Sequence, residues 1–218
     1  CNIEKSKEIL MSALHNDAST TVGRYGNRTY NYFSSQYNTY SGGYVPRGQY
    51  IGDMEFQRCR PTEYTYAVFD NVNDSRMWKT FKTVYGICNN VATPDYVKAE
   101  NAPTFGDQGV LFLLNKKDDT RFRKDEFGRA AIKHTFVNPE TGKWVPNVAP
   151  VYAEGQYVMN TYGTSAANRS NMFCGINKTA DGSRTGEKGD AHRDVTMARV
   201  GETYLVKAEC QVRNGDDA

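Results

Sequence analysis

The sequence lacks a long hydrophobic run and an excess of charge of either sign. Its longest apolar stretch is 110–114, about one buried strand, which is far shorter than a helix that spans a membrane. The 27 Lys and Arg residues nearly balance the 25 Asp and Glu residues, and the net charge is +2. No basic run indicates a nucleic-acid or lipid-headgroup site, so neither class of ligand is expected.

Motifs for metals and for catalysis are also missing. The five cysteines form no CxxC pair and no Cys/His cluster, which argues against a zinc site. Their odd number argues against a complete disulfide framework, so we expect buried free thiols. His15, His134 and His192 lie in different segments, and neither GxSxG nor HExxH occurs. No catalytic residue, metal or cofactor is therefore predicted.

Tyrosine and glycine are abundant, with 15 and 19 residues respectively. Hydrophobic residues make up 39% of the chain and the mean hydropathy is -0.70, which argues against a compact core. From Gly23 to Tyr50 aromatic rings alternate with Gly, Asn, Ser and Arg without helical or strand periodicity. Such a segment predicts a long, ordered aromatic loop.

Local patterns predict a few regular elements elsewhere. Residues 2–15 have the pattern of a short amphipathic helix, and residues 77–85 alternate like a strand. A further strand is expected at 110–114, followed by a turn at 116–119. Another strand is expected at 131–137, ending in a turn over 138–142. A polar loop at 181–190 leads into the final segment.

The final segment has the pattern of one amphipathic helix. Asp194 is a suitable N-cap, and Asn214-Gly215 is a suitable left-handed stop. Small residues on or beside its apolar stripe would let a second helix approach closely. Because no such partner follows, the segment has the pattern of half a helical hairpin. The stripe consists of Met197, Gly201, Tyr204, Leu205, Ala208 and Val212.

This segment resembles a signature of the SusD/RagB family. An Arg193-Asp194 pair precedes the stretch from Arg199 to Cys210, which is similar to the family's Arg-Leu-Ala-Glu-x-Tyr-Leu-x-x-Ala-Glu-Ala helix. Arg213-Asn214-Gly215-Asp216 is similar to its Arg-x-Gly-Asp end. The stretches 74–81 and 106–115 also resemble family segments.

The resemblance implies a mainly α fold, with tetratricopeptide-type helix pairs and a large irregular, loop-rich subdomain containing short β-strands. The chain would be one partial SusD/RagB-like domain over 1–218. Within it, 1–16 would be a helical piece, 17–192 the loop-rich subdomain and 193–218 a helix of a truncated pair.

Members of this family are lipid-anchored proteins at the outer membrane and cell surface of Bacteroidota. They capture nutrients and pass them to a SusC-like TonB-dependent transporter. The resemblance therefore implies a non-catalytic, oligosaccharide-binding component of such an uptake system, anchored through a lipid outside this fragment. Whether Cys1 is itself the lipidated residue stays open.

Aromatic side chains are the candidates for ligand binding. The C–H face of a sugar packs on a Trp or Tyr ring, while its hydroxyls take hydrogen bonds at the ring edge. Trp144 lies beside a turn, Trp78 lies in the predicted strand, and three tyrosines come from the aromatic loop. The predicted ligand-binding residues are Trp144, Tyr37, Tyr40, Tyr44 and Trp78.

Three other functions remain open. An oligopeptide-binding lipoprotein of the same family should have a groove that pairs with a peptide backbone. A surface glycoside hydrolase should bring two acids to within about 5–10 Å in an aromatic cleft, drawn from residues such as Asp107, Asp118, Asp119 and Asp125. A purely structural helical-repeat scaffold should bury the tyrosines of residues 25–50.

Overall fold

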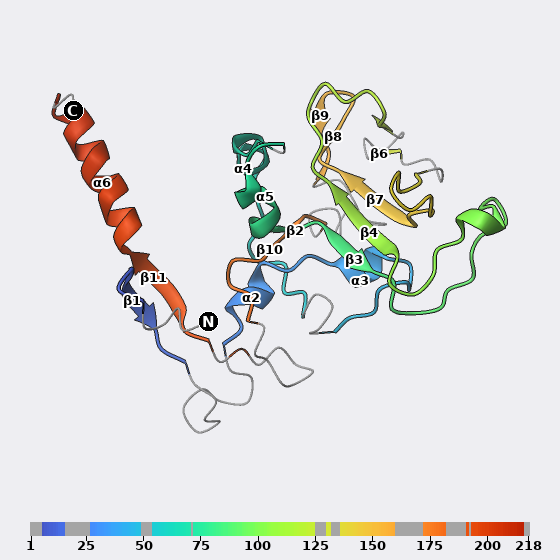
Figure 1. Cartoon of the computed structure of the whole chain (residues 1–218), viewed down its shortest axis with the longest axis horizontal. Coiled ribbons are helices and arrows are strands. Elements are labelled where there is room, and N and C mark those ends of the chain that lie inside the picture. The colour runs from blue at the N-terminus through green and yellow to red at the C-terminus, as the bar shows by residue number, and fades with distance from the viewer. Residues whose placement is uncertain are drawn as a thin grey trace. The chain divides into compact units, whose positions relative to one another are not determined.

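The computed structural model describes residues 6–15, 27–48, 54–70, 72–124, 130–131, 136–159, 172–181, 191 and 193–215. The chain divides into two compact units (Figure 1). Unit 1 consists of Cys1–Arg28, Asp181–Thr185 and Asp190–Ala218. Unit 2 consists of Thr29–Ala180 and Gly186–Gly189.

The fold is mixed α/β, and the predicted mainly α, tetratricopeptide-type fold is wrong. The described residues hold five α-helices, of which only the last is longer than six residues, together with five small sheets. The abundant Tyr, Asn, Thr and Gly residues are weak helix formers, and short helices gain too few hydrogen bonds to persist without packing.

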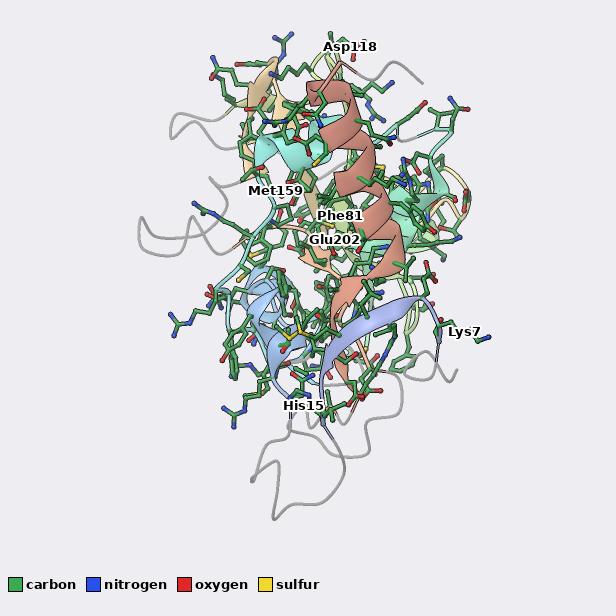
Figure 2. The ribbon with its side chains drawn as sticks, turned by 90° about the vertical axis from the view of Figure 1, so that its left-hand side faces the viewer. Lys7, His15, Phe81, Asp118, Met159 and Glu202 are labelled. Atoms are coloured by element: carbon green, nitrogen blue, oxygen red, sulfur yellow. The ribbon has the colours of Figure 1, made fainter. Side chains whose placement is uncertain are left out.

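Unit 1 contains a two-stranded antiparallel ribbon and one helix. Strand β1 (Ile9–Ala13) pairs with β11 (Val195–Arg199), and α6 (Val200–Arg213) follows β11 directly. The backbone N–H of Val200 donates to the Glu8 carbonyl at 2.8 Å, which joins the start of α6 to the ribbon. No residue of α6 is buried, and Glu202, labelled in Figure 2, lies in its first turn.

Both predicted terminal helices need correction. The described part of the helical piece 1–16 contains strand β1, because its pairing with β11 outweighs the local helical pattern. The helix predicted from residue 193 begins only at Val200, and Val195–Arg199 is a strand. Long-range pairing of this kind leaves no trace in local periodicity.

Unit 2 is organised around a three-stranded sheet, in the order β3-β4-β7 (Figure 1). Strand β3 (Val84–Gly86) is antiparallel to β4 (Gln108–Leu113), and β7 (Asn147–Pro150) is parallel to β4. The strand predicted at 110–114 is thus confirmed over 110–113, which lie in β4. The two-stranded pairs of this unit are β2 (Phe81–Lys82) with β10 (Gly175–Ile176), β5 (Arg123–Lys124) with β6 (Ala130–Ala131), and β8 (Tyr152–Ala153) with β9 (Gln156–Tyr157).

Four short helices of unit 2 precede β2 in the chain, and a 3₁₀ turn lies between β3 and β4. They are α2 (Thr29–Tyr32), α3 (Tyr37–Tyr40), α4 (Glu63–Val68), α5 (Ser75–Thr80) and the 3₁₀ turn η2 (Ala99–Asn101). The prediction of one strand over 77–85 is wrong, since α5 occupies its first part. The Asp74 side chain caps α5 by accepting from the Arg76 N–H, and Met77 and Thr80 are buried at helical spacing.

Tyrosine supplies much of the core of unit 2, which corrects the expectation that the composition disfavours a compact core. Tyr37, Tyr66 and Tyr85 are buried beside Phe112 and Phe173. The Tyr66 hydroxyl accepts from the Cys174 N–H at 3.1 Å, and the Tyr37 hydroxyl accepts from the Gly48 N–H at 3.2 Å. A buried ring with a bonded hydroxyl adds apolar burial without leaving an unpaired polar group.

The turn predicted at 138–142 is confirmed. The N–H of Gly142, at a φ of +69°, donates to the Asn138 carbonyl at 2.8 Å. The Asn138 side chain accepts from the Glu140 N–H at 2.9 Å, as expected for Asn in a turn. Most of the predicted strand at 131–137 and most of the polar loop at 181–190 lie outside the described residues.

Candidate functional site

Three of the five predicted ligand-binding residues are core residues. Tyr37, Tyr44 and Trp144 are 0%, 7% and 4% exposed. Trp144 meets Tyr44 and Tyr96 edge-on, with 6.3 Å and 5.9 Å between ring centroids. The backbone N–H of Trp144 donates to the Asn101 carbonyl at 2.9 Å. This bond helps to hold the Trp144 ring inward, just after the turn at 138–142. These rings offer no open platform to a sugar.

Most of the described tyrosines in the aromatic segment 23–50 are buried or half-buried. Tyr37 stacks on Tyr85, with 4.5 Å between centroids and 12° between ring planes. Tyr40 is half-buried and donates its hydroxyl to the Val148 carbonyl at 2.8 Å, and burial raises its pKa. Tyr30 is also buried, whereas Tyr32 is 42% exposed. This burial agrees with what the structural-scaffold alternative predicted for these tyrosines; Tyr25 and Tyr50 lie outside the described residues.

Trp78 is the predicted residue whose ring lies at the surface. It is 55% exposed on α5, while its neighbour Met77 turns into the core. The sequence placed Trp78 in a strand, so its exposed position on a helix is a finding of the structure.

Unit 2 has a groove that the five predicted residues do not line. Its volume is about 390 Å³, and it lies between the C-terminal half of α4, the turn after β4 and strand β8. Buried Tyr66 and Tyr152 lie at its base, and half-buried Phe69 lies in its wall. We call it the α4–β8 groove; its lining is Tyr66, Ala67, Val68, Phe69, Asp70, Asn115, Lys116, Lys117 and Tyr152.

Local hydrogen bonds hold the walls of the α4–β8 groove. Thr62 caps α4 by accepting from the Thr65 N–H. The Asn115 amide donates to the Tyr152 carbonyl at 2.8 Å, and its Oδ1 accepts from the Tyr152 N–H at 2.9 Å. This pair of hydrogen bonds resembles the pairing of two strands, so it fixes the turn after β4 to β8.

An ion pair between Lys117 and Glu63 lies over Tyr152, one of the two aromatic residues at the bottom of the groove. The Lys117 ammonium lies 2.7 Å from a Glu63 carboxylate oxygen and 5.5 Å from the centre of the Tyr152 ring. Glu63 raises the pKa of Lys117, and burial, assisted by the negative charge of Glu63, raises the pKa of Tyr152. The charge of Lys117 is therefore compensated within the protein.

Asp70 has its hydrogen-bonding capacity committed to its own turn. Its Oδ1 accepts from the Val72 N–H at 2.9 Å and the Asn73 N–H at 3.3 Å, and its Oδ2 accepts from the Asn73 side chain at 2.8 Å. These bonds, the Val72 one foremost, lower the pKa of Asp70. The carboxylate stays ionised at neutral pH, which makes it unsuited to donate a proton.

The acids considered for glycoside hydrolysis lie outside the groove lining. Asp107 accepts from the Thr104 N–H and hydroxyl at 2.7 Å and 2.9 Å. Asp119 pairs with Arg121, which lowers the pKa of Asp119 through their side-chain hydrogen bond. Asp118 is exposed, and Asp125 lies outside the described residues. Asp107 therefore closes a turn, and Asp119 pairs with arginine.

Thiols and possible metal ligands also occur in the described part of the chain. Within it, no cluster of three or more His, Cys, Asp or Glu residues is arranged to hold a metal ion. Cys174 is buried as expected and Cys88 is half-buried, but Cys59 and Cys210 are exposed, so the prediction of buried thiols is wrong for these two. Across the described ranges, no helix has the length and apolar character needed to cross a bilayer.

Comparison of the chain with protein-family models, with curated proteins and with solved structures gives no match. The function is therefore inferred from the residues of this chain.

Local sequence patterns do not identify the α4–β8 groove, because its parts come from three distant segments. One signal was present: a turn was expected at 116–119, directly after the best-defined strand. Asn115, Lys116 and Lys117 belong to that turn region, but nothing in the local pattern brings Tyr66 and Tyr152 beside them.

Proposed function

We propose that this chain is a non-catalytic, oligosaccharide-binding component of a SusC/SusD-type TonB-dependent nutrient uptake system at the outer membrane. The observation that carries the proposal is the α4–β8 groove, which combines an aromatic base with a polar rim. Sugars present C–H faces that pack on aromatic rings and hydroxyls that bond to amide and charged groups, so the two surfaces are complementary.

The resemblance of residues 193–216 to the SusD/RagB signature supports the uptake context. In this proposal the captured ligand passes to a SusC-like transporter, and the protein reaches the membrane through a lipid anchor. The tetratricopeptide-type helix pairs are no part of the proposal, since the described fold contradicts them.

The protonation and pairing of the carboxylates in and near the groove support binding without cleavage. A glycoside hydrolase needs one carboxyl kept protonated as the acid, beside a second carboxylate. Asp70 has a lowered pKa, and the nearby Glu63 pairs with Lys117. Among the described residues, Glu55 has a raised pKa because of burial, but it does not line the groove.

A glycan array followed by calorimetry on the purified chain tests this function. Ala67→Phe fills the groove from an exposed position on α4, and Ala208→Phe makes the same change at an exposed position of α6. We expect Ala67→Phe to abolish glycan binding and Ala208→Phe to leave it unchanged. Binding of peptides but of no glycan would overturn the proposal, and turnover of a glycan would refute its non-catalytic part.

A further inference from the structure

The α4–β8 groove presents hydrogen-bond donors more readily than acceptors. Both oxygens of Asp70 accept bonds from residues 72 and 73, and both polar atoms of the Asn115 side chain bond to Tyr152. These bonds leave at most one lone pair on each of these oxygens for a sugar hydroxyl. A ligand that offers acceptors fits this rim better than one that offers only donors.

Lys116 is the rim cation whose charge is not matched by an ion pair. Its neighbour Lys117 is paired with Glu63 at 2.7 Å. Within the described ranges, no carboxylate oxygen lies within 4.0 Å of the Lys116 ammonium. Asp70 is close enough for the Lys116 charge to contribute weakly to its lowered pKa, but its oxygens are held by its own turn.

Resting on the proposed function, we propose that the groove selects acidic glycans and that Lys116 binds the carboxylate of a uronic acid unit. The ring of that unit would pack toward the aromatic base, and its carboxylate would accept charge-assisted hydrogen bonds from the ammonium. A charge-assisted bond is stronger than a neutral one, and it can favour an acid over its neutral analogue.

The test uses the full chain and matched pairs of ligands. The probes are oligogalacturonates, alginate oligosaccharides and chondroitin oligosaccharides, each compared by calorimetry with its carboxyl methyl ester. We expect at least one acid to bind about tenfold more tightly than its ester, a preference that weakens as salt is added. Equal binding of acid and ester, or preference for the ester, would overturn the inference.

Two lysine variants assign the preference to Lys116. Lys116→Met should remove the preference for the acid and leave ester binding in place, and Lys178→Met, an exposed lysine of unit 2 outside the groove lining, should change neither. If Lys116 instead only stabilises the C-terminal end of α4, Lys116→Met will lower the melting temperature without changing the preference. That result overturns the inference.

The outcomes also separate this inference from the proposed function. Binding of neutral glycans alone leaves the proposed function standing and overturns the acidic preference. Binding of no glycan of either kind overturns both.

Discussion

The carboxylate of Asp194 accepts a hydrogen bond from the backbone N–H of His15, with 2.7 Å between oxygen and nitrogen. The bond lies at the end of the β1–β11 ribbon, where Ala13 pairs with Val195. His15, just past the end of β1, is labelled in Figure 2. Asp194 therefore fastens two segments distant in sequence, and the expectation that it caps the final helix is wrong, since α6 begins at Val200.

Removing this acceptor should loosen the ribbon of unit 1. Asp194→Ala is expected to cost about 1–3 kcal/mol of local stability, because it deletes a bond to a charged acceptor. Asp194→Asn keeps an acceptor oxygen and should cost less. Amide hydrogen exchange over β1 and β11 measures the effect; equal exchange in all three proteins would contradict this role.

Gly201 and Gly109 should respond oppositely to the same substitution. A Cβ at Gly201 in α6 would meet no atom within 4 Å, so Gly201→Ala should stabilise the helix by about 0.5–1 kcal/mol. A Cβ at Gly109 in β4 would lie 3.0 Å from side-chain atoms of Ile87 and Val45, so Gly109→Ala should destabilise unit 2. Circular dichroism and thermal unfolding check both; a gain in stability for Gly109→Ala would contradict the packing described for β4.

Glu55 should make unit 2 less stable as the pH rises. Its side chain is 1% exposed and pairs with half-exposed Arg47, and burial raises its pKa above the ordinary 4.5. The folded chain then holds this proton more tightly than the unfolded chain does. The resulting stabilisation is complete below the unfolded pKa and is lost as the pH rises through the folded pKa.

Glu55→Gln removes this titration while keeping an acceptor for Arg47. The free energy of unfolding of the variant should rise relative to the native chain between about pH 4 and pH 7. Taking the difference between the two proteins cancels the opposite contributions of Asp70 and Asp119, whose pKa values are lowered. A difference that is constant over this range would show that Glu55 is not buried as described.

The two tryptophans should be distinguishable by substitution and by fluorescence. Trp144→Ala should destabilise unit 2 by about 3–5 kcal/mol, because Trp144 is 4% exposed within the aromatic core. Trp78→Ala removes a 55% exposed ring and should cost within about 0.5 kcal/mol. Trp144→Phe should leave a fluorophore that acrylamide quenches readily, and Trp78→Phe one that it quenches poorly. Similar quenching of the two variants would contradict this assignment.

Strong local signals were predicted well from the sequence. Residues 110–113 of the apolar run lie in β4, and the Asn-Pro-Glu-Thr-Gly segment forms the expected turn. Both signals are properties of a few neighbouring residues: a continuous apolar run and a glycine at positive φ. The strand predicted over 77–85 was wrong because alternation over a few residues is a weak signal. The Asp74 cap and the burial of Met77 and Thr80 at helical spacing favour a helix instead.

The candidate site depends on contacts that no local pattern encodes. Whether Tyr37 or Trp144 is a binding platform or a core residue is decided by segments distant in sequence, such as the strand of Tyr85 and the turn of Asn101. The groove itself needs Tyr66, Asn115 and Tyr152 together, and their meeting is a property of the folded chain alone.

The parallel pairing of β4 with β7 has a consequence for the time course of folding. Residues 108–113 cannot complete their sheet until residue 150 is available, and β2 waits for its partner at residues 175–176. Contacts of such large sequence separation close slowly, because the entropy of the intervening loop is lost before they form. During synthesis, the apolar face of β4 would therefore stay uncovered while the next several dozen residues emerge, which is the interval in which a chaperone would be most useful.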